Sequence, residues 1–303
     1  MGILFVGNHS DASAVNEGDE ELISILANQI GQSVENAQLF EQVYRSSQIL
    51  ESKVQERTKQ LESALADVKQ ISENKSEFIS AVSHELRTPL TSIKGYASLL
   101  MTGKLGDIPD QVKERLEKIN KHSDNLVKLI NDLLDIARIE SGKMELKVKP
   151  QTITHIIENV HDLLTPQLRE KNLKWITEIP DNTPAVPIDP ALIERVFINL
   201  IGNAIKFTFQ GHIKVTVTHD EKNLKIEVSD TGIGINEGDI PKLFNEFYRV
   251  DNEINQVVKG SGLGLSLVKN IIEAHRGDIW ITSKVDKGTT IHFTLPLKET
   301  PAA

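Results

Sequence analysis

The chain has 303 residues, a formal net charge of −9 at pH 7 and no cysteine. This length allows two modest domains and a connecting segment. The negative charge argues against non-specific binding to nucleic acid or anionic lipid, and the lack of cysteine excludes disulfide bonds and cysteine-bound metals. No apolar run approaches the length of a membrane span. We therefore expect this part of the protein to be soluble and cytoplasmic, although an upstream segment could tether the full-length protein to a membrane.

The first 37 residues predict the end of a domain rather than a whole one. Residues 3–6 predict a strand, and a strand without a partner is not stable alone. A polar loop and a helix follow. Residues 19–37 resemble the last helix of a GAF sensor domain, which implies that the sensor's ligand pocket lies upstream of this chain.

Residues 38–75 predict a coiled-coil helix. No proline or glycine occurs between Leu39 and Ser83, and apolar residues fall into two rows at heptad spacing. The rows are Val54, Leu61, Val68 and Val82, and Leu50, Ala64, Ile71 and Phe78. Arg57 and Lys75 also occupy row positions, where polar side chains lower stability but fix register. A plain spacer helix is the alternative, but a helix this long needs a partner to cover its stripe, which favours a two-stranded signalling rod.

The next helix carries a histidine in an unusual setting. Its apolar seam is formed by Ile79, Leu86, Ile93 and Leu100. At 100° per residue, His84 lies about 130° from this seam and faces solvent. Glu85 is its neighbour, Thr88 lies one turn further on over the same face, and Pro89 is expected to bend the helix. A lone surface histidine would most simply be structural, but the acid, the hydroxyl and the proline beside it favour a functional site.

A second helix is expected to pair with this one. Residues 102–109 are rich in helix breakers, and residues 110–139 again show an apolar side. Two antiparallel helices would leave too wide an apolar face for a monomer. Residues 76–143 therefore predict an all-α hairpin that dimerises into a four-helix bundle.

Residues 144–298 predict a different kind of domain. Strands are expected at residues 175–178, 212–218, 224–228, 278–283 and 289–295, and helices at 155–170, 190–207 and 263–275. Because strands and helices do not alternate strictly, we expect an α+β two-layer sandwich, with helices on one face of a mixed sheet. Residues 180–190 are proline-rich and predict a connection, and residues 299–303 a tail. The chain as a whole is therefore expected to be multidomain.

The helix expected at residues 190–207 carries polar groups on one face. Asn199, Asn203 and Lys206 are spaced four and three residues apart, so their side chains lie together. An amide oxygen suits Mg²⁺, which accepts few protein ligands, and an ammonium group pairs with phosphate. Asparagine is a poor helix former, so a purely structural role explains these residues less well.

Two glycine-rich segments, residues 230–235 and 260–265, follow in the chain. Glycines before a helix allow backbone N–H groups to reach phosphate oxygens. Either segment alone could be a simple turn. Neither matches the dinucleotide fingerprint, and the chain has no Walker-type phosphate loop. The sequence therefore predicts a nucleotide site of another architecture.

Taken in order, these segments resemble the motifs of sensor histidine kinases. The string from Ser83 to Leu90, Ser-His-Glu-Leu-Arg-Thr-Pro-Leu, is similar to the H-box of that family. The later motifs resemble the N-box (199–208), the G1 box (230–235), the F-box (243–249), the G2 box (260–265) and the last glycine motif (288–290). The resemblance covers about residues 76–298. It implies a HisKA-type dimerisation and phospho-acceptor domain followed by an HATPase_c ATP-binding domain of the gyrase and histidine kinase type.

The resemblance implies roles in phosphoryl transfer for four residues. His84 would accept the phosphoryl group, and Glu85 would be its acid/base partner. Thr88 would hold water for the reverse, phosphatase chemistry. Asn199 would lie among the catalytic residues of the ATP-binding domain.

The resemblance also implies a site for ATP with Mg²⁺. Asn203 would hold the metal, Lys206 would contact phosphate, and Asp230 would accept a hydrogen bond from the adenine amino group, which favours ATP over GTP. Residues 236–259 would form a lid. Further nucleotide contacts are implied for Gly232, Gly234, Phe244, Tyr248, Gly260, Gly262, Leu263, Gly264 and Thr289.

Three functions compete at this point. A mechanical ATPase of the gyrase kind would carry a glutamate base four residues before the metal-binding asparagine, where this chain has Asn199. A catalytically inactive dimeric scaffold would show a degraded motif, and none is degraded. We therefore expect an autokinase, which passes the phosphoryl group from ATP to His84 and then to an aspartate in the receiver domain of a response regulator.

Overall fold

The computed structural model describes residues 17–103, 106–251 and 260–298. The strand predicted at residues 3–6 and the tail at 299–303 lie outside the described residues, as does part of the predicted lid. The chain divides into two units, Met1–Lys69 and Gln70–Ala303.

Helix α1 (Glu17–Met101) provides the described structure of the first unit. Its large apolar side chains are exposed there; for example, Leu50 and Leu61 are 64% and 63% exposed. Rows of exposed apolar residues at heptad spacing are typical of a helix that pairs with a second one. Residues 19–37 are part of this continuous helix, and their resemblance to a sensor-domain helix stays a prediction.

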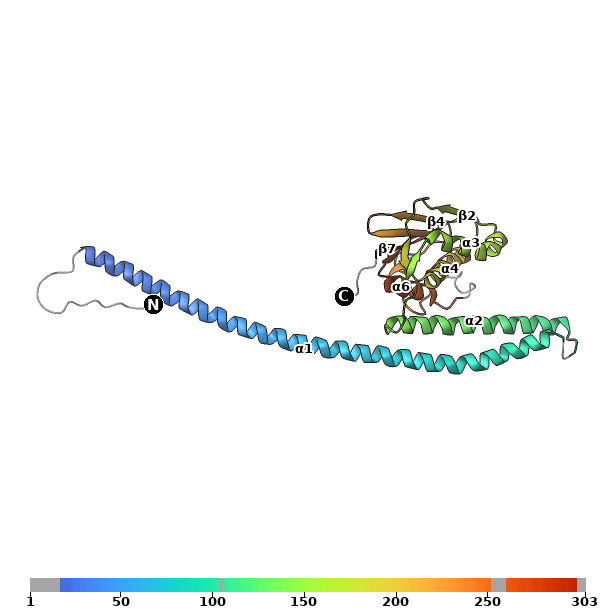
Figure 1. Ribbon diagram of the computed structural model, residues 1–303, viewed down its shortest axis with the longest axis horizontal. Helices are drawn as coiled ribbons and strands as arrows, with labels where there is room; N and C mark the ends of the chain where they lie inside the picture. The colour runs from blue at the N-terminus through green and yellow to red at the C-terminus, as the bar shows by residue number, and fades with distance from the viewer. Residues whose placement is uncertain (1–16, 104–105, 252–259, 299–303) are drawn as a thin grey trace, which may run out of the picture. The chain divides into compact units, whose positions relative to one another are not determined.

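In the second unit, the end of α1 pairs antiparallel with α2 (Asp110–Glu140) (Figure 1). The amide of Asn131 accepts a hydrogen bond from Arg87, with 2.9 Å between the atoms. Small side chains of α1, Ser76, Ser83 and Ala97, are buried. The helix continues through Pro89, and the teal part of α1 is curved (Figure 1). The bend expected at this proline stays a prediction.

The hairpin leaves apolar side chains of both helices uncovered. Leu86 and Ile93 are 44% and 47% exposed. The other half-exposed side chains of this set are Val82, Leu100, Val112, Ile119 and Leu126. A second hairpin would cover such a face in a four-helix bundle, and the dimer itself stays a prediction.

The predicted α+β sandwich follows the hairpin. Its five-stranded sheet has the order β2-β4-β5-β7-β6. The strands are β2 (Lys174–Glu178), β4 (His212–His219), β5 (Asn223–Asp230), β6 (Ile279–Lys284) and β7 (Gly288–Pro296). Strands β2 and β4 are parallel and the other pairs are antiparallel, so the sheet is mixed. Helices on one face are α3 (Ile153–Glu170), α4 (Pro190–Phe207) and α6 (Gly264–Ala274) (Figure 1).

Three short elements were not predicted. Strands β1 (Lys149–Gln151) and β3 (Val186–Ile188) form a separate antiparallel pair, and a 3₁₀ turn, η1, covers Ile240–Lys242. Residues 180–190 are therefore not only a connection. Each strand has three residues and contains a proline, Pro150 or Pro187, so neither shows the alternation that marks a strand in sequence.

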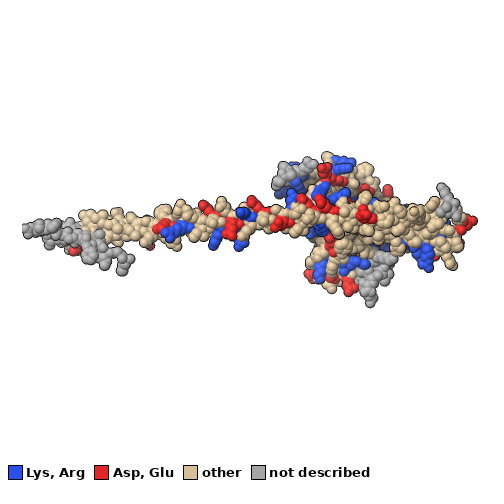
Figure 2. Space-filling model, turned by 90° about the horizontal axis from the view of Figure 1, so that it is seen from below, with Lys and Arg blue, Asp and Glu red and all other residues tan. Residues whose placement is uncertain are grey.

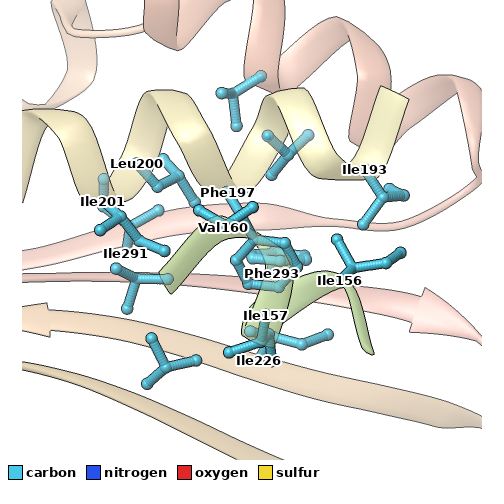
Figure 3. Packing of buried hydrophobic residues seen from close by; sticks show 14 of the residues in the cluster. Ile156, Ile157, Val160, Ile193, Phe197, Leu200, Ile201, Ile226, Ile291 and Phe293 are labelled. Atoms are coloured by element: carbon cyan, nitrogen blue, oxygen red, sulfur yellow. The ribbon is translucent and has the colours of Figure 1, made fainter. Parts of the chain in front are cut away.

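The core lies between the sheet and its helices. Phe197 of α4 and Phe293 of β7 pack edge to face, with ring centroids 5.7 Å apart (Figure 3). The labelled side chains around them are Ile156, Ile157, Val160, Ile193, Leu200, Ile201, Ile226 and Ile291. Buried apolar surface stabilises the fold by about 25 cal/mol per Å². This packing fixes the rotation of α4, so that its opposite, polar face is held in one direction.

Charges of both signs are interspersed on the face seen in Figure 2, rather than gathered into a basic patch. This agrees with the acidic composition of the chain. Within the described ranges, no helix has the length and hydropathy needed to cross a membrane.

A buried histidine ties the N-terminal end of α4 to the end of α6. His275 Nδ1–H donates to the carbonyl of Ile271, at 2.8 Å, and its Nε2 accepts from the backbone N–H of Asp189, at 2.9 Å. This pair of bonds requires the neutral ring. Burial lowers the pKa of His275, although the Ile271 carbonyl and the charge of Asp189 oppose that shift.

This histidine should make stability depend on pH. Because its folded-state pKa lies below the ordinary value, the unfolded chain takes up the proton first as the pH falls through about 6.5. We expect the free energy of unfolding to fall between pH 7 and pH 5. His275→Gln should lower stability at pH 7 by about 1–3 kcal/mol and flatten this dependence. Urea unfolding of the wild type and of His275→Gln at several pH values measures this dependence, with His155→Gln, at an exposed histidine, as control. If the free energy of unfolding of His275→Gln falls with pH as steeply as that of the wild type, the proposed role of His275 is wrong.

Candidate functional site

A pocket of about 950 Å³ lies over the polar face of α4 and the C-terminal end of β5. It brings together residues predicted from distant motifs. Those lining it are Asn199, Asn203, Lys206, Asp230, Gly234, Tyr248, Gly260, Gly262, Gly264 and Thr289. Residues of α2 border it as well.

The start of α4 sets which face meets this pocket. Asp189 caps the helix, because its carboxylate accepts from the backbone N–H groups of Ala191 and Leu192, at 3.1 and 3.3 Å. Pro190 occupies the first turn, where its missing N–H is not needed. One turn before Asn203, the amide of Asn199 donates to the carbonyl of Arg195 at 2.9 Å. The two asparagines thus lie along one wall.

Lys206 supplies positive charge to the pocket. Burial lowers the pKa of its ammonium group, and the charge of Arg249 lowers it further. The side chain lies over the ring of Phe207, 5.0 Å from its centroid. A Cβ atom on Gly260 would come within 2.8 Å of the ammonium nitrogen. A half-buried cation in an open pocket attracts an anion, such as a phosphate group.

Asp230, at the end of β5, supplies a carboxylate to the pocket. Its Oδ1 accepts from the backbone N–H groups of Gly232, at 2.7 Å, and of Thr289, at 3.4 Å. Burial raises the pKa of Asp230, and these two hydrogen bonds oppose the shift. Such a carboxylate can accept hydrogen bonds from a ligand that offers N–H groups.

Two of the glycines are required by their surroundings. Gly234 has φ +67°, and a Cβ atom there would lie 2.0 Å from the carbonyl oxygen of Lys284. Gly262 has φ +76° and would meet the backbone of Phe247 at 2.6 Å. The N–H of Phe247 in turn donates to the carbonyl of Gly262, and Phe247 itself has φ +61°. These close approaches shape the pocket wall.

Three residues predicted to contact nucleotide do not line the pocket. Phe244 packs against the hydrophobic core, and Leu263 is buried. Gly232 lies against the carbonyl oxygen of Phe207, 2.5 Å from where its Cβ would be. In this structure these residues support the wall rather than face the cavity.

His84 lies in a second cleft, of about 630 Å³, between α1, α2 and the start of α4. Its side chain is exposed, as predicted from the helical register. Glu85 and Thr88 are exposed too but do not line this cleft. The hydroxyl of Thr88 donates to the carbonyl of His84 at 3.3 Å.

Residues of α2 connect the two cavities. Lys128 and Asp132 line both of them. Arg195 of α4 forms ion pairs with Asp132, at 2.8 Å, and with Asp135. Burial raises the pKa of Asp132, and Arg195 opposes the shift. None of these residues was predicted, although Arg195 lies four residues before Asn199 and its place on the same face of α4 was a usable signal.

Two family models match the chain. The model described as "His Kinase A (phospho-acceptor) domain" matches residues 74–142, and the one described as "Histidine kinase-, DNA gyrase B-, and HSP90-like ATPase" matches residues 188–299. The chain is a member of the sensor histidine kinases. The first match contains His84, and the second contains the polar face of α4 and the glycine-rich segments.

Curated histidine kinases are similar over most of the chain. The circadian input-output histidine kinase CikA of Synechococcus elongatus is 34% identical over 92% of this chain and 37% of its own length. The sensor histidine kinase WalK of Bacillus subtilis is 35% identical over 78% of this chain and 39% of its own. This histidine kinase chain thus spans less than half the length of these relatives.

Two solved structures share the fold. Full-length ShkA in complex with AMPPNP matches 75% of this chain and 47% of its own, with a TM-score of 0.65 and 26% identity. ThkA in complex with the response regulator protein TrrA matches 73% of this chain and 61% of its own, with a TM-score of 0.52 and 26% identity.

Replacing a glycine by alanine should lower stability in the pocket wall and raise it in α4. Gly234→Ala forces a Cβ into the Lys284 carbonyl and should weaken ATP binding at least tenfold while lowering stability. Gly202→Ala, in the interior of α4 with open space around its Cβ position, should stabilise the protein by about 0.5–1 kcal/mol. Calorimetric ATP titration and thermal unfolding test both variants. Equal ATP affinity and equal stability of the two variants would contradict the tight packing of the pocket wall at Gly234.

Proposed function

We propose that this histidine kinase chain binds ATP in the larger pocket, phosphorylates His84, and passes the phosphoryl group to an aspartate of a response regulator. The observation that carries the proposal is the sharing of Lys128 and Asp132 by the cleft around His84 and the pocket over α4. Donor and acceptor sites thus adjoin the same stretch of α2. Phosphoryl transfer depends mainly on positioning and charge neutralisation, which adjoining sites favour.

His84 acts in this proposal as the nucleophile. A neutral imidazole offers the lone pair that attacks the γ-phosphorus, and the exposed ring is accessible to it. Glu85, its neighbour in the chain, orients the ring and takes up its proton. The bond between the γ-phosphorus and the bridging oxygen of ATP breaks, and ADP leaves.

The pocket residues hold ATP. Asp230 accepts a hydrogen bond from the adenine amino group and so favours ATP over GTP, which presents an acceptor there. Lys206 pairs with phosphate as a point charge. Asn199 lies beside them as an amide, which cannot deprotonate water, so attack by His84 is favoured over hydrolysis.

Mg²⁺ fits this site with Asn203 as its protein ligand. The described residues contain no group of three or more histidine, cysteine or carboxylate side chains that could hold a metal ion. A single amide suits Mg²⁺, which keeps several waters and takes its other ligands from the phosphates. When bound, the ion neutralises charge that develops on the phosphates.

The proposed organisation follows the predicted boundaries. Residues 1–37 end a GAF-like sensor, 38–75 form a signalling coiled coil, 76–143 dimerise and carry His84, and 144–298 bind ATP. The exposed apolar face of the hairpin supports a homodimer. The complex of ThkA with TrrA supports a response regulator as partner. We place the protein in the cytoplasm, where ATP and response regulators occur.

The acceptor assignment can be tested directly. His84→Gln should bind ATP like the wild type. From γ-labelled ATP, it should incorporate less than 1% of the label that the wild type incorporates. The wild-type label should be lost in acid, as a phosphoramidate is and a phosphoserine is not. His122→Gln, an exposed histidine on α2, is the matched control and should label normally. Undiminished labelling of His84→Gln would refute the assignment, and an unlabelled wild type would leave a scaffold function.

The proposed phosphatase activity depends on Thr88. If its hydroxyl orients water, Thr88→Ala should lower dephosphorylation of the response regulator at least tenfold and leave autophosphorylation within about threefold. Thr91→Ala is a matched control, because the Thr91 hydroxyl makes the same kind of bond, to the Arg87 carbonyl at 2.9 Å. Loss of both activities in Thr88→Ala alone would instead indicate a structural role.

A further inference from the structure

The C-terminal end of α4 is held by a lysine from another helix. The last carbonyls of a helix have no partner within it. The ammonium group of Lys171 donates to the carbonyls of Ile205, Lys206 and Thr208, at 2.7, 2.9 and 3.3 Å. One cation therefore satisfies three carbonyl groups where α4 ends.

The end of α3 determines where Lys171 lies. The N–H of Leu173 donates to the carbonyl of Leu168, and the N–H of Asn172 donates to that of Arg169. Asn172 has φ +53°, so α3 ends in a Schellman motif. Leu168 and Leu173 are both buried, which anchors the turn in the core. Lys171, immediately before the left-handed residue, is thereby directed toward α4.

The environment of Lys171 suits this role. Burial lowers the pKa of its ammonium group, and the charge of Glu170 opposes the shift. The ammonium also lies 5.3 Å from the centroid of the Phe209 ring. Positive charge at the C-terminal end of a helix is favourable because the carbonyl dipoles converge there.

The end of α4 also contacts the nucleotide pocket in two ways, through a side chain that lines it and through a carbonyl that holds the glycine-rich segment after β5. Lys206 reaches into the pocket from it. The carbonyl of Phe207 accepts from the N–H of Ile233, at 3.3 Å, and Ile233 lines the pocket as well. Lys171 itself does not line the pocket, so it can act on a ligand only through these residues.

We propose that Lys171 is a positioning residue for nucleotide binding. By holding the carbonyls of Ile205, Lys206 and Thr208, it fixes the direction of the Lys206 side chain and the position of the Phe207 carbonyl. The glycine-rich loop after Asp230 is in turn held by that carbonyl. This inference rests on the proposed binding of ATP over the polar face of α4.

The test compares Lys171→Met with Lys171→Arg in the 303-residue chain, at a temperature where thermal unfolding shows each to be folded. Lys171→Met should weaken binding of ATP with Mg²⁺ at least tenfold and raise KM for ATP by a similar factor, with kcat within threefold of the wild type. Lys171→Arg keeps a multivalent cationic donor and should stay within threefold in both. Lys174→Met, which removes an exposed lysine from β2, should have no effect.

The role of Lys206 adds a second readout. If Lys171 acts through Lys206, adding Lys206→Met to Lys171→Met should weaken ATP binding less than Lys206→Met does in the wild type. Should Lys171→Met fail to fold, Lys171→Gln, which keeps one neutral donor group, is measured in its place and should bind ATP with Mg²⁺ more weakly than Lys171→Arg does.

The outcomes separate the two proposals. A folded Lys171→Met or Lys171→Gln protein with wild-type affinity and only a lower Tm overturns the positioning role and leaves ATP binding intact. Full additivity with Lys206→Met also overturns it. A wild-type protein that binds no ATP overturns the proposed function and, with it, this inference.

Discussion

The structure depends on how α4 is held. One side of this helix is packed into the core by Phe197 and Leu200, which are almost fully buried. Burial of one face fixes the rotation of the helix about its axis. The opposite face, with Asn199 and Asn203, is therefore directed toward the pocket. The N-terminal end is fixed by Asp189, and the C-terminal end by the ammonium of Lys171. A single well-packed element therefore sets the direction of the charged and amide groups that meet a nucleotide.

Helix α2 has the complementary task, because the donor and acceptor sites lie on different elements. It pairs with α1 next to His84 and borders the pocket over α4, with Lys128 and Asp132 common to both cavities. Asp132 is buried, and Arg195 compensates its charge. Removing one partner of such a pair leaves an uncompensated buried charge, which typically destabilises by about 3–5 kcal/mol. The contact between α2 and α4 is therefore sensitive to the loss of Arg195.

Periodic patterns explain what was predictable. The bounds of α4 follow from its capping Asp189, from Pro190 and from an apolar face, and they match the prediction, as does the two-layer sandwich. The proline-containing strands β1 and β3 have no such pattern. The ion pair of Arg195 with Asp132 and the bonds of Lys171 to the end of α4 join residues 63 and 34–37 positions apart. Local sequence carries no record of such pairings, which arise only from packing of whole elements.

One polar position in the predicted coiled-coil seam has a structural partner. Lys75 of α1 pairs with Glu140 at the end of α2, at 2.9 Å, and with Glu246 of the F-box, at 3.7 Å. Both carboxylates raise the pKa of Lys75, Glu140 more strongly, whereas its burial lowers it. The side chains of Lys75 and Glu140 are 45% and 38% exposed, and an ion pair this exposed contributes only about 0–1 kcal/mol. The F-box, which contributes Tyr248 to the pocket, is joined to α1 through this ion pair with Glu246, whose Oε1 atom is buried.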